Sequence, residues 1–125
     1  MSSPTSIFVY GTLMTDGRQA KLLGNRPRQA ATAHGALYDL PAGYPALVPG
    51  DTGVVHGELV RFINERVLHM LDLYEGVPQG LYQRVILDVR CNTEHCRAWT
   101  WVMRDADIRD GRRIPNGRWR PLRRR

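Results

Sequence analysis

Long apolar segments are absent from this sequence of 125 residues. No run approaches the ~20 consecutive apolar residues that a membrane-spanning helix needs. The first residues, MSSPTSIFVYG, have no positively charged region and too short an apolar stretch for a signal peptide. We therefore expect a cytoplasmic protein without a membrane partner. The length suits one domain, and a composition of 42% hydrophobic and 24% charged residues suffices for one core.

Nucleotide-binding and metal-binding motifs are also missing. The sequence has no G-x-G-x-x-G and no Walker motif, so nothing in it indicates a nucleotide site. Cysteine is scarce: Cys91 and Cys96 flank the residues NTEH, and their spacing with His95 matches none of the common zinc patterns. A reducing cytosol also disfavours a disulfide between them. We therefore predict no metal site here, and a plain turn between two strands.

The net charge of +6 is unevenly distributed along the chain. Residues 108–125 contain eight Arg and one Asp, whereas residues 1–107 contain ten basic and eleven acidic residues. We therefore predict a single domain over residues 1–119, followed by an Arg-rich tail over residues 120–125. Such a tail could bind nucleic acid or an acidic partner. It has no aromatic platform beyond Trp119 and follows no recognised binding module, so a solvated terminus is the favoured interpretation.

The apolar pattern predicts successive strands interrupted by only two helices. Asp16 and Gly24 could bound the first helix, and Asn64 and Gly76 could cap and end the second. This order predicts an α+β fold with a largely antiparallel or mixed sheet, which could curl into a barrel. The expected helices are residues 16–24 and 64–76; the expected strands are residues 6–10, 28–40, 54–62, 81–91, 96–103 and a short one near Trp119, with a loop over residues 42–51 that contains a short extended piece.

Glu75 falls on an unexpected side of the second helix. It follows Leu71 by four residues, and so it projects with the apolar stripe that should face the core. By the same spacing, Asp72 falls on the opposite, polar face. The stripe consists of Val67, Leu68, Leu71 and Tyr74.

A carboxyl group that points inward must be paired, hydrogen-bonded or protonated. Burial and the negative end of the helix dipole should both raise the pKa of Glu75 toward neutrality. A carboxyl group tuned in this way is a competent general base and general acid. The structural alternative is a buried carboxylate that bonds to the backbone or to Arg84.

The sequence VYGTL, residues 9–13, is unusual because a buried strand opens into glycine and threonine. Gly11 would permit unusual dihedral angles and the close approach of a ligand. The backbone N–H groups could then form a concavity that binds a carboxylate or a developing oxyanion, reinforced by a helix beginning near Asp16. The alternative is a plain tight turn.

Together these segments resemble the gamma-glutamylcyclotransferase-like family, which includes the AIG2-like proteins and the gamma-glutamylamine cyclotransferases. The resemblance extends from Ile7 to about Trp119 and depends on several motifs in order. They are FVYGTLM, HGALYDLPAGYPALV, VHGELVRF, LDLYEGVPQGLYQR, AWTWV and a late GRW.

The resemblance implies that this α+β fold is a small mixed, mostly antiparallel β-barrel flanked by short helices. It also implies a cofactor-independent enzyme that cyclises a γ-glutamyl amide to 5-oxoproline and releases a free amine. It implies that Glu75 is the acid/base residue. It also implies that the loop formed by Tyr10, Gly11, Thr12 and Leu13 binds the glutamyl part of a small-molecule substrate. Tyr82 and Arg84 match a recurrent Y-x-R element, for which strand packing or an ion pair is an equal alternative. Tyr38 and Tyr44 are further candidates to line the pocket on the same terms.

Two other functions remain open on the sequence alone. The first is a non-catalytic small-ligand binding module of the same fold, and the intact Glu75 and YGTL favour the enzyme over it. The second is binding of nucleic acid or an acidic partner through the Arg-rich tail, which the near-neutral residues 1–107 disfavour. The sequence identifies neither the leaving amine nor the oligomeric state.

Overall fold

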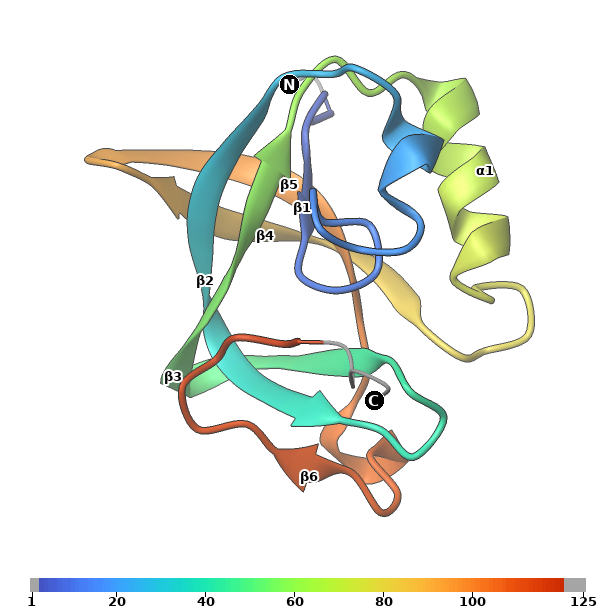
Figure 1. The fold of residues 1–125 in the computed structure, drawn as a ribbon, viewed down its shortest axis with the longest axis vertical. Coiled ribbons are helices and arrows are strands. Elements are labelled where there is room, and N and C mark those ends of the chain that lie inside the picture. Colours follow the sequence, from blue (N-terminus) through green and yellow to red (C-terminus); the bar gives the residue numbers. More distant parts are fainter. Residues whose placement is uncertain (1–2, 121–125) are drawn as a thin grey trace.

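The computed structural model describes residues 3–120, which form a closed five-stranded barrel with one flanking α-helix (Figure 1). The strands hydrogen-bond in the order β3-β1-β5-β4-β2, and β2 pairs again with β3 to close the ring. Among the described strands, β1 and β5 pair in parallel and the other pairs are antiparallel. The predicted α+β, mostly antiparallel barrel is thus confirmed. The strands are β1 (Ile7–Val9), β2 (Arg28–Asp39), β3 (Pro45–Val60), β4 (Gln83–Cys91), β5 (Glu94–Val102) and β6 (Arg112–Arg113).

The helix α1 (Glu65–Tyr74) begins and ends where the sequence predicts. The Asn64 side chain accepts a hydrogen bond of 2.9 Å from the Val67 amide, which caps the N-terminus. Gly76, with φ of 70°, ends the helix in a left-handed conformation. The amides of Gly76 and Val77 reach back to the carbonyls of Leu73 and Asp72, which is a Schellman motif.

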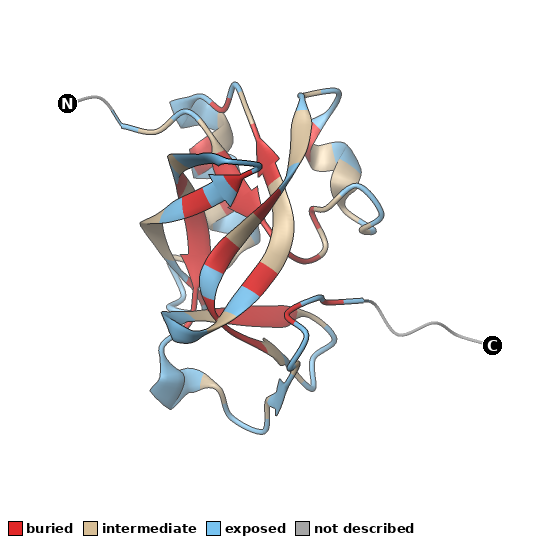
Figure 2. Ribbon diagram, turned by 90° about the vertical axis from the view of Figure 1, so that its left-hand side faces the viewer, coloured by how far each residue is buried: buried red, intermediate tan, exposed pale blue. Residues whose placement is uncertain are grey.

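Two hydrophobic cores meet at β1, which explains its unbroken apolar run. Successive side chains of a strand point to opposite faces, and here both faces are covered. Phe8 belongs to the core inside the barrel, together with Leu37 and Leu59. Ile7 and Val9 belong to a second core between the barrel and α1. In Figure 2 the buried residues, drawn in red, lie mainly on the strands.

Three local predictions are wrong. Residues 16–24 form turns and then only a short 3-10 helix, η1 (Ala20–Leu23), whose N-cap is Gln19 and not Asp16. The expected loop over residues 42–51 is largely strand, since β3 already begins at Pro45. No strand forms near Trp119; instead β6 lies earlier, and a second 3-10 helix, η2 (Asp105–Asp107), precedes it.

Tertiary pairing explains the misjudged length of β3. Its N-terminal part pairs with β2 in register as far as Pro49 opposite Gly35, and the register then shifts so that Val54 lies opposite His34. Residues 50–53 are accommodated at this irregularity, so the prolines and glycines of β3 do not end the strand. The bend it creates separates the barrel proper from the lower β2–β3–β6 part of the molecule (Figure 1).

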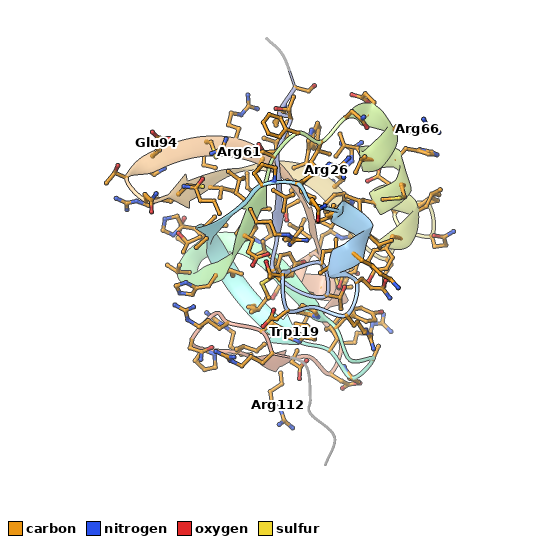
Figure 3. The ribbon with its side chains drawn as sticks, turned by 45° about the horizontal axis from the view of Figure 1, so that its top comes forward. Arg26, Arg61, Arg66, Glu94, Arg112 and Trp119 are labelled. Carbon is orange, nitrogen blue, oxygen red and sulfur yellow. The ribbon has the colours of Figure 1, made fainter. Side chains whose placement is uncertain are left out.

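The β4–β5 hairpin is confirmed, although its turn is tighter than the four residues NTEH. Cys91 pairs with Glu94, so only two residues, Asn92 and Thr93, form the turn, and Asn92 has φ of 56°. Figure 3 shows Glu94 at the far end of this hairpin, on the side of the molecule away from α1. Trp119 follows β6 and is buried, and its indole N–H donates to Asp39 at 3.1 Å.

No helix within residues 3–120 has the length and apolar character needed to cross a membrane. The predicted division into a domain over residues 1–119 and an Arg-rich tail over residues 120–125 remains a prediction. All of that tail except Arg120 lies outside the described residues.

Candidate active site

A pocket of about 220 Å³ opens beside the C-terminal end of β1. The loop after β1 forms one wall and the C-terminal end of α1 forms the other, and the two segments lie side by side (Figure 1). The pocket brings together predicted site residues from three separate parts of the chain: Tyr10, Gly11, Thr12, Leu13, Glu75 and Tyr82. Their individual roles remain predictions.

Glu75 is the C-cap residue of α1, and its backbone amide still donates to the Leu71 carbonyl at 2.8 Å. The Schellman motif at Gly76 fixes the backbone on its other side. The side chain borders the pocket, and within residues 3–120 it forms no ion pair and no hydrogen bond. Burial raises the pKa of Glu75 from 4.5 to about 7. Because the carboxyl group has no partner, burial acts on it without compensation.

The predicted outward orientation of Asp72 is wrong. Its carboxylate lies against the barrel, where Oδ1 accepts from Arg84 Nε at 2.8 Å and from Trp101 Nε1 at 2.9 Å. Arg84 also stacks on the Trp99 ring, with the guanidinium carbon 4.3 Å from the ring centroid. Arg84 therefore pairs with Asp72 and not with Glu75, and it does not line the pocket.

The loop after β1 leaves several backbone amides free. Gly11 and Met14 close a turn, in which the Met14 amide donates to the Gly11 carbonyl at 3.0 Å. Among the described residues, the amides of Gly11, Thr12 and Leu13 donate to no protein acceptor. Free amides at the edge of a pocket can bind a carboxylate or stabilise an oxyanion.

A partly buried ion pair holds this loop from behind. Arg28 on β2 donates to Glu58 on β3 at 2.8 Å, and it also donates to the carbonyls of Leu13 and Ala20. Glu58 in turn accepts from the Thr15 amide at 2.8 Å. These contacts turn the loop carbonyls toward the barrel wall. The helix expected near Asp16 is absent, so no helix dipole contributes to this loop.

The reason for glycine at position 11 differs from the predicted one. Gly11 is not among the residues with positive φ. A Cβ atom there would lie 2.7 Å from Cγ and 2.9 Å from Cδ of Pro45. Glycine is therefore required by the close approach of the Pro45 ring, which itself forms part of the pocket wall.

The hydroxyl groups of two predicted tyrosines are held by the backbone. Tyr10 donates to the Trp101 carbonyl at 2.6 Å and accepts from the Leu47 amide at 3.2 Å. Tyr82 donates to the Pro45 carbonyl. Burial, and then the neighbouring charge of Glu75, raise the pKa of Tyr10, and burial raises that of Tyr82. Both rings are therefore neutral walls of the pocket.

Arg18 and Tyr74 line the pocket, although the sequence patterns assigned neither of them to it. Arg18 is the one cationic side chain among the described residues that line it. Tyr74, predicted to face the core, is 40% exposed, and its hydroxyl shares a hydrogen bond of 2.7 Å with the Thr12 hydroxyl. Tyr44 lines the pocket, whereas Tyr38 does not. No sequence signal marks Arg18, because only the folded loop brings it to α1.

The two cysteines lie on neighbouring strands as free thiols. Burial, followed by the proximity of Cys96, raises the pKa of Cys91 to about 11. Among residues 3–120, no group of three or more His, Cys, Asp or Glu side chains is arranged to hold a metal ion.

Comparison with known proteins identifies the family. A sequence model of the family described as gamma-glutamyl cyclotransferase, AIG2-like, matches residues 7–121. The chain is 30% identical to Protein AIG2 C from Arabidopsis thaliana over 115 residues, which cover 85% of this chain and 67% of that protein. The chain therefore belongs to the AIG2-like gamma-glutamyl cyclotransferase family.

Solved structures share the fold. An AIG2-like protein from Mus musculus superposes with a TM-score of 0.71 at 24% identity, covering 82% of this chain and 78% of that one. YkqA from Bacillus subtilis gives a TM-score of 0.74 at 24% identity and covers 94% of this chain. The chain spans only 40% of the length of YkqA.

Proposed function

We propose that this protein is a γ-glutamyl cyclotransferase, which converts a γ-glutamyl amide into 5-oxoproline and a free amine. The observation that carries the proposal is the unpaired carboxyl group of Glu75. It borders a pocket opposite free backbone amides, and burial raises its pKa to about 7. Family membership supports the class of reaction.

The reaction requires one proton acceptor and one oxyanion site. The α-ammonium group of the substrate can reach its own γ-carbonyl through a five-membered ring, but it cannot attack until it loses a proton. Glu75 takes that proton. The amine nitrogen then bonds to the γ-carbon, and the carbonyl oxygen becomes an oxyanion that accepts hydrogen bonds from the amides of Gly11, Thr12 and Leu13.

Collapse of this intermediate breaks the bond between the γ-carbon and the leaving nitrogen. Glu75 returns its proton to that nitrogen. The ring nitrogen gives up a second proton, which also ends on the released amine, an ammonium ion at neutral pH. The nucleophile belongs to the substrate, so the protein needs no nucleophilic Ser or Cys. Holding the chain curled adds to an already large effective molarity.

The buried walls of the pocket suit this role because their two tyrosine hydroxyls do not compete for the proton. The Tyr10 and Tyr82 hydroxyls are committed to backbone carbonyls. The apolar rings of Phe8, Pro45 and Trp101 border the remaining space. Such a site strengthens the hydrogen bonds to the oxyanion by excluding water.

Release of 5-oxoproline from a panel of γ-glutamyl compounds tests the proposal. We expect turnover by the wild type on at least one member, and its loss in Glu75→Gln. Binding without turnover by the wild type on every member would instead support a ligand-binding module. A panel that covers amino acids, the ε-amine of lysine and simple alkyl amines separates these outcomes.

A further inference from the structure

Exposed apolar side chains gather at the mouth of the pocket. Among the described residues, large hydrophobic side chains with substantial exposure are few, and most of them lie on α1 or just after it. Met70, Leu73 and Tyr74 share one face of α1, at spacings of three and four residues. Leu81 lies 43% exposed beside the helix end, where its amide donates to the Gly76 carbonyl at 3.0 Å.

This apolar strip, defined as Met70, Leu73, Tyr74 and Leu81, runs into the pocket. Tyr74 and Leu81 line the pocket itself, while Met70 and Leu73 continue outward along the helix. Leu73 is 55% exposed and does not line the pocket. The part of the strip that belongs to the pocket is therefore Tyr74 and Leu81.

The exposure of the lining residues indicates which part of a substrate meets Tyr74 and Leu81. Glu75 and the residues with free amides in the loop after β1 are buried or half-buried, whereas Tyr74 and Leu81 are exposed, so the ring-forming glutamyl part sits beside Glu75 and the loop amides. The leaving amine is attached to the γ-carbonyl and must extend toward the mouth. There it meets Tyr74 and Leu81 on the α1 side of the opening.

We propose that the substrate is a γ-glutamyl amide whose amine carries an apolar body, which packs on the strip at Tyr74 and Leu81. This inference deepens the proposed function and depends on it for the placement of the glutamyl part. Small polar leaving groups gain nothing from the strip and leave it exposed to water. Apolar contact with Leu81 lowers the KM for an apolar amine, because it is made before the reaction as well as during it.

Two substrates of nearly equal shape provide the test. γ-Glutamyl-leucine and γ-glutamyl-asparagine differ at the end of the leaving side chain, where two methyl groups replace an amide. We expect wild-type kcat/KM for 5-oxoproline release to favour the leucyl compound by about tenfold or more, since each buried methyl group contributes several-fold. Equal values for the two compounds would overturn the inference while leaving the cyclotransferase activity intact.

Substitutions of Leu81 test whether the preference for the leucyl compound arises at the strip. Leu81→Asn should bring the ratio close to one by raising the KM for the leucyl compound, and Leu81→Met should retain it. Phe62→Asn is the matched control, because Phe62 is 71% exposed, lies outside the pocket and has φ of 64°, which asparagine tolerates. A preference that survives Leu81→Asn, or disappears in Phe62→Asn, would contradict the assignment.

Binding to Glu75→Gln separates this inference from the proposed function. Calorimetry with that variant measures the dissociation constants of the two compounds without turnover. Tighter binding of γ-glutamyl-leucine by about tenfold supports the strip even if the wild type releases no 5-oxoproline. Binding of neither compound would overturn the strip assignment together with the placement of the glutamyl part.

Discussion

Asp72 and Glu75 lie three residues apart at the end of α1, and their carboxyl groups meet opposite environments. Asp72 accepts hydrogen bonds from both Arg84 and Trp101, whereas Glu75 has no partner within the described residues. Trp101 links the two, because its indole N–H is held by Asp72 while its ring borders the pocket beside Glu75. The Asp72 carboxylate thus holds Trp101 in the pocket wall, and the Glu75 carboxyl group is available for proton transfer.

We predict that these two carboxylates respond differently to amide substitution. Glu75→Gln should fold normally and lose about 10²–10⁴-fold in kcat, because glutamine cannot accept the ammonium proton. Asp72→Asn should retain most of kcat and lose about 1–3 kcal/mol of stability, since it leaves the Arg84 charge without its carboxylate. Urea unfolding and 5-oxoproline release measure the two effects. Wild-type turnover in Glu75→Gln, with loss of turnover in Asp72→Asn, would reverse the assignment.

The pH dependence of stability should depend on Glu75. Its pKa is raised to about 7 by burial, so between pH 4.5 and 7 the unfolded chain loses this proton while the native protein keeps it. The contribution of Glu75 to stability is thus fully present below pH 4.5 and is lost as the pH rises through 7. At pH 8, Glu75→Gln should therefore be more stable than the wild type by about 2–3 kcal/mol. The gain should vanish near pH 4.

Catalytic activity should rise with pH where the stability falls, since the reaction needs the carboxylate form of Glu75. We expect kcat/KM to rise with pH through about 7 in the wild type. Glu94→Gln is the control for both measurements, because Glu94 is exposed on the hairpin far from α1 (Figure 3). Stability of Glu75→Gln that matches the wild type at pH 8 would show that the carboxyl group is not desolvated.

Arg18 should bind a carboxylate of the substrate. It is the cationic side chain at the mouth of the pocket, and a γ-glutamyl compound carries at least one carboxylate. Arg18→Gln should raise KM by about tenfold, with a weaker salt dependence than in the wild type. Arg66→Gln is the matched control, because Arg66 lies near the start of α1 and does not line the pocket (Figure 3). Equal KM values for the two variants would exclude this role.

The sequence located Glu75 well and Asp72 badly, for one physical reason. Helical periodicity reports which residues share a face, and it placed Glu75 with Leu71 on the inner side. It treats every other polar residue as solvent-facing. Asp72 is drawn inward by Arg84 and Trp101, which lie 12 and 29 residues away in sequence.

Other errors arise in the same way from distant partners. The prolines and glycines near Pro45 disfavour a strand. Pro45 nevertheless begins β3, because β2 supplies the pairing partner. The loop after β1 is shaped by Arg28 and Glu58 and not by a helix. Arg18 has no neighbours in sequence that mark it, and its place at the pocket follows from that loop.

Within the loop after β1, substitutions of Thr12 test backbone recognition more sharply than a substitution of Gly11. Gly11→Ala would place a Cβ atom 2.7 Å from Pro45, so it should cost about 1–3 kcal/mol of stability and displace the pocket wall. Its effect on turnover would therefore mix recognition with packing. Thr12 separates the two, because its hydroxyl and its amide have different partners.

The Thr12 hydroxyl bonds to Tyr74, while the Thr12 amide is free. Thr12→Val removes only the hydroxyl and should cost about 1 kcal/mol of stability with little change in turnover. Thr12→Pro also removes the amide donor. Thr12 is the second residue of the turn from Gly11 to Met14, where proline fits well. Thr12→Pro should therefore fold and lose about 10²–10³-fold in kcat relative to Thr12→Val. Equal turnover by the two variants, with matching circular dichroism spectra, would show that this amide does not contact the oxyanion.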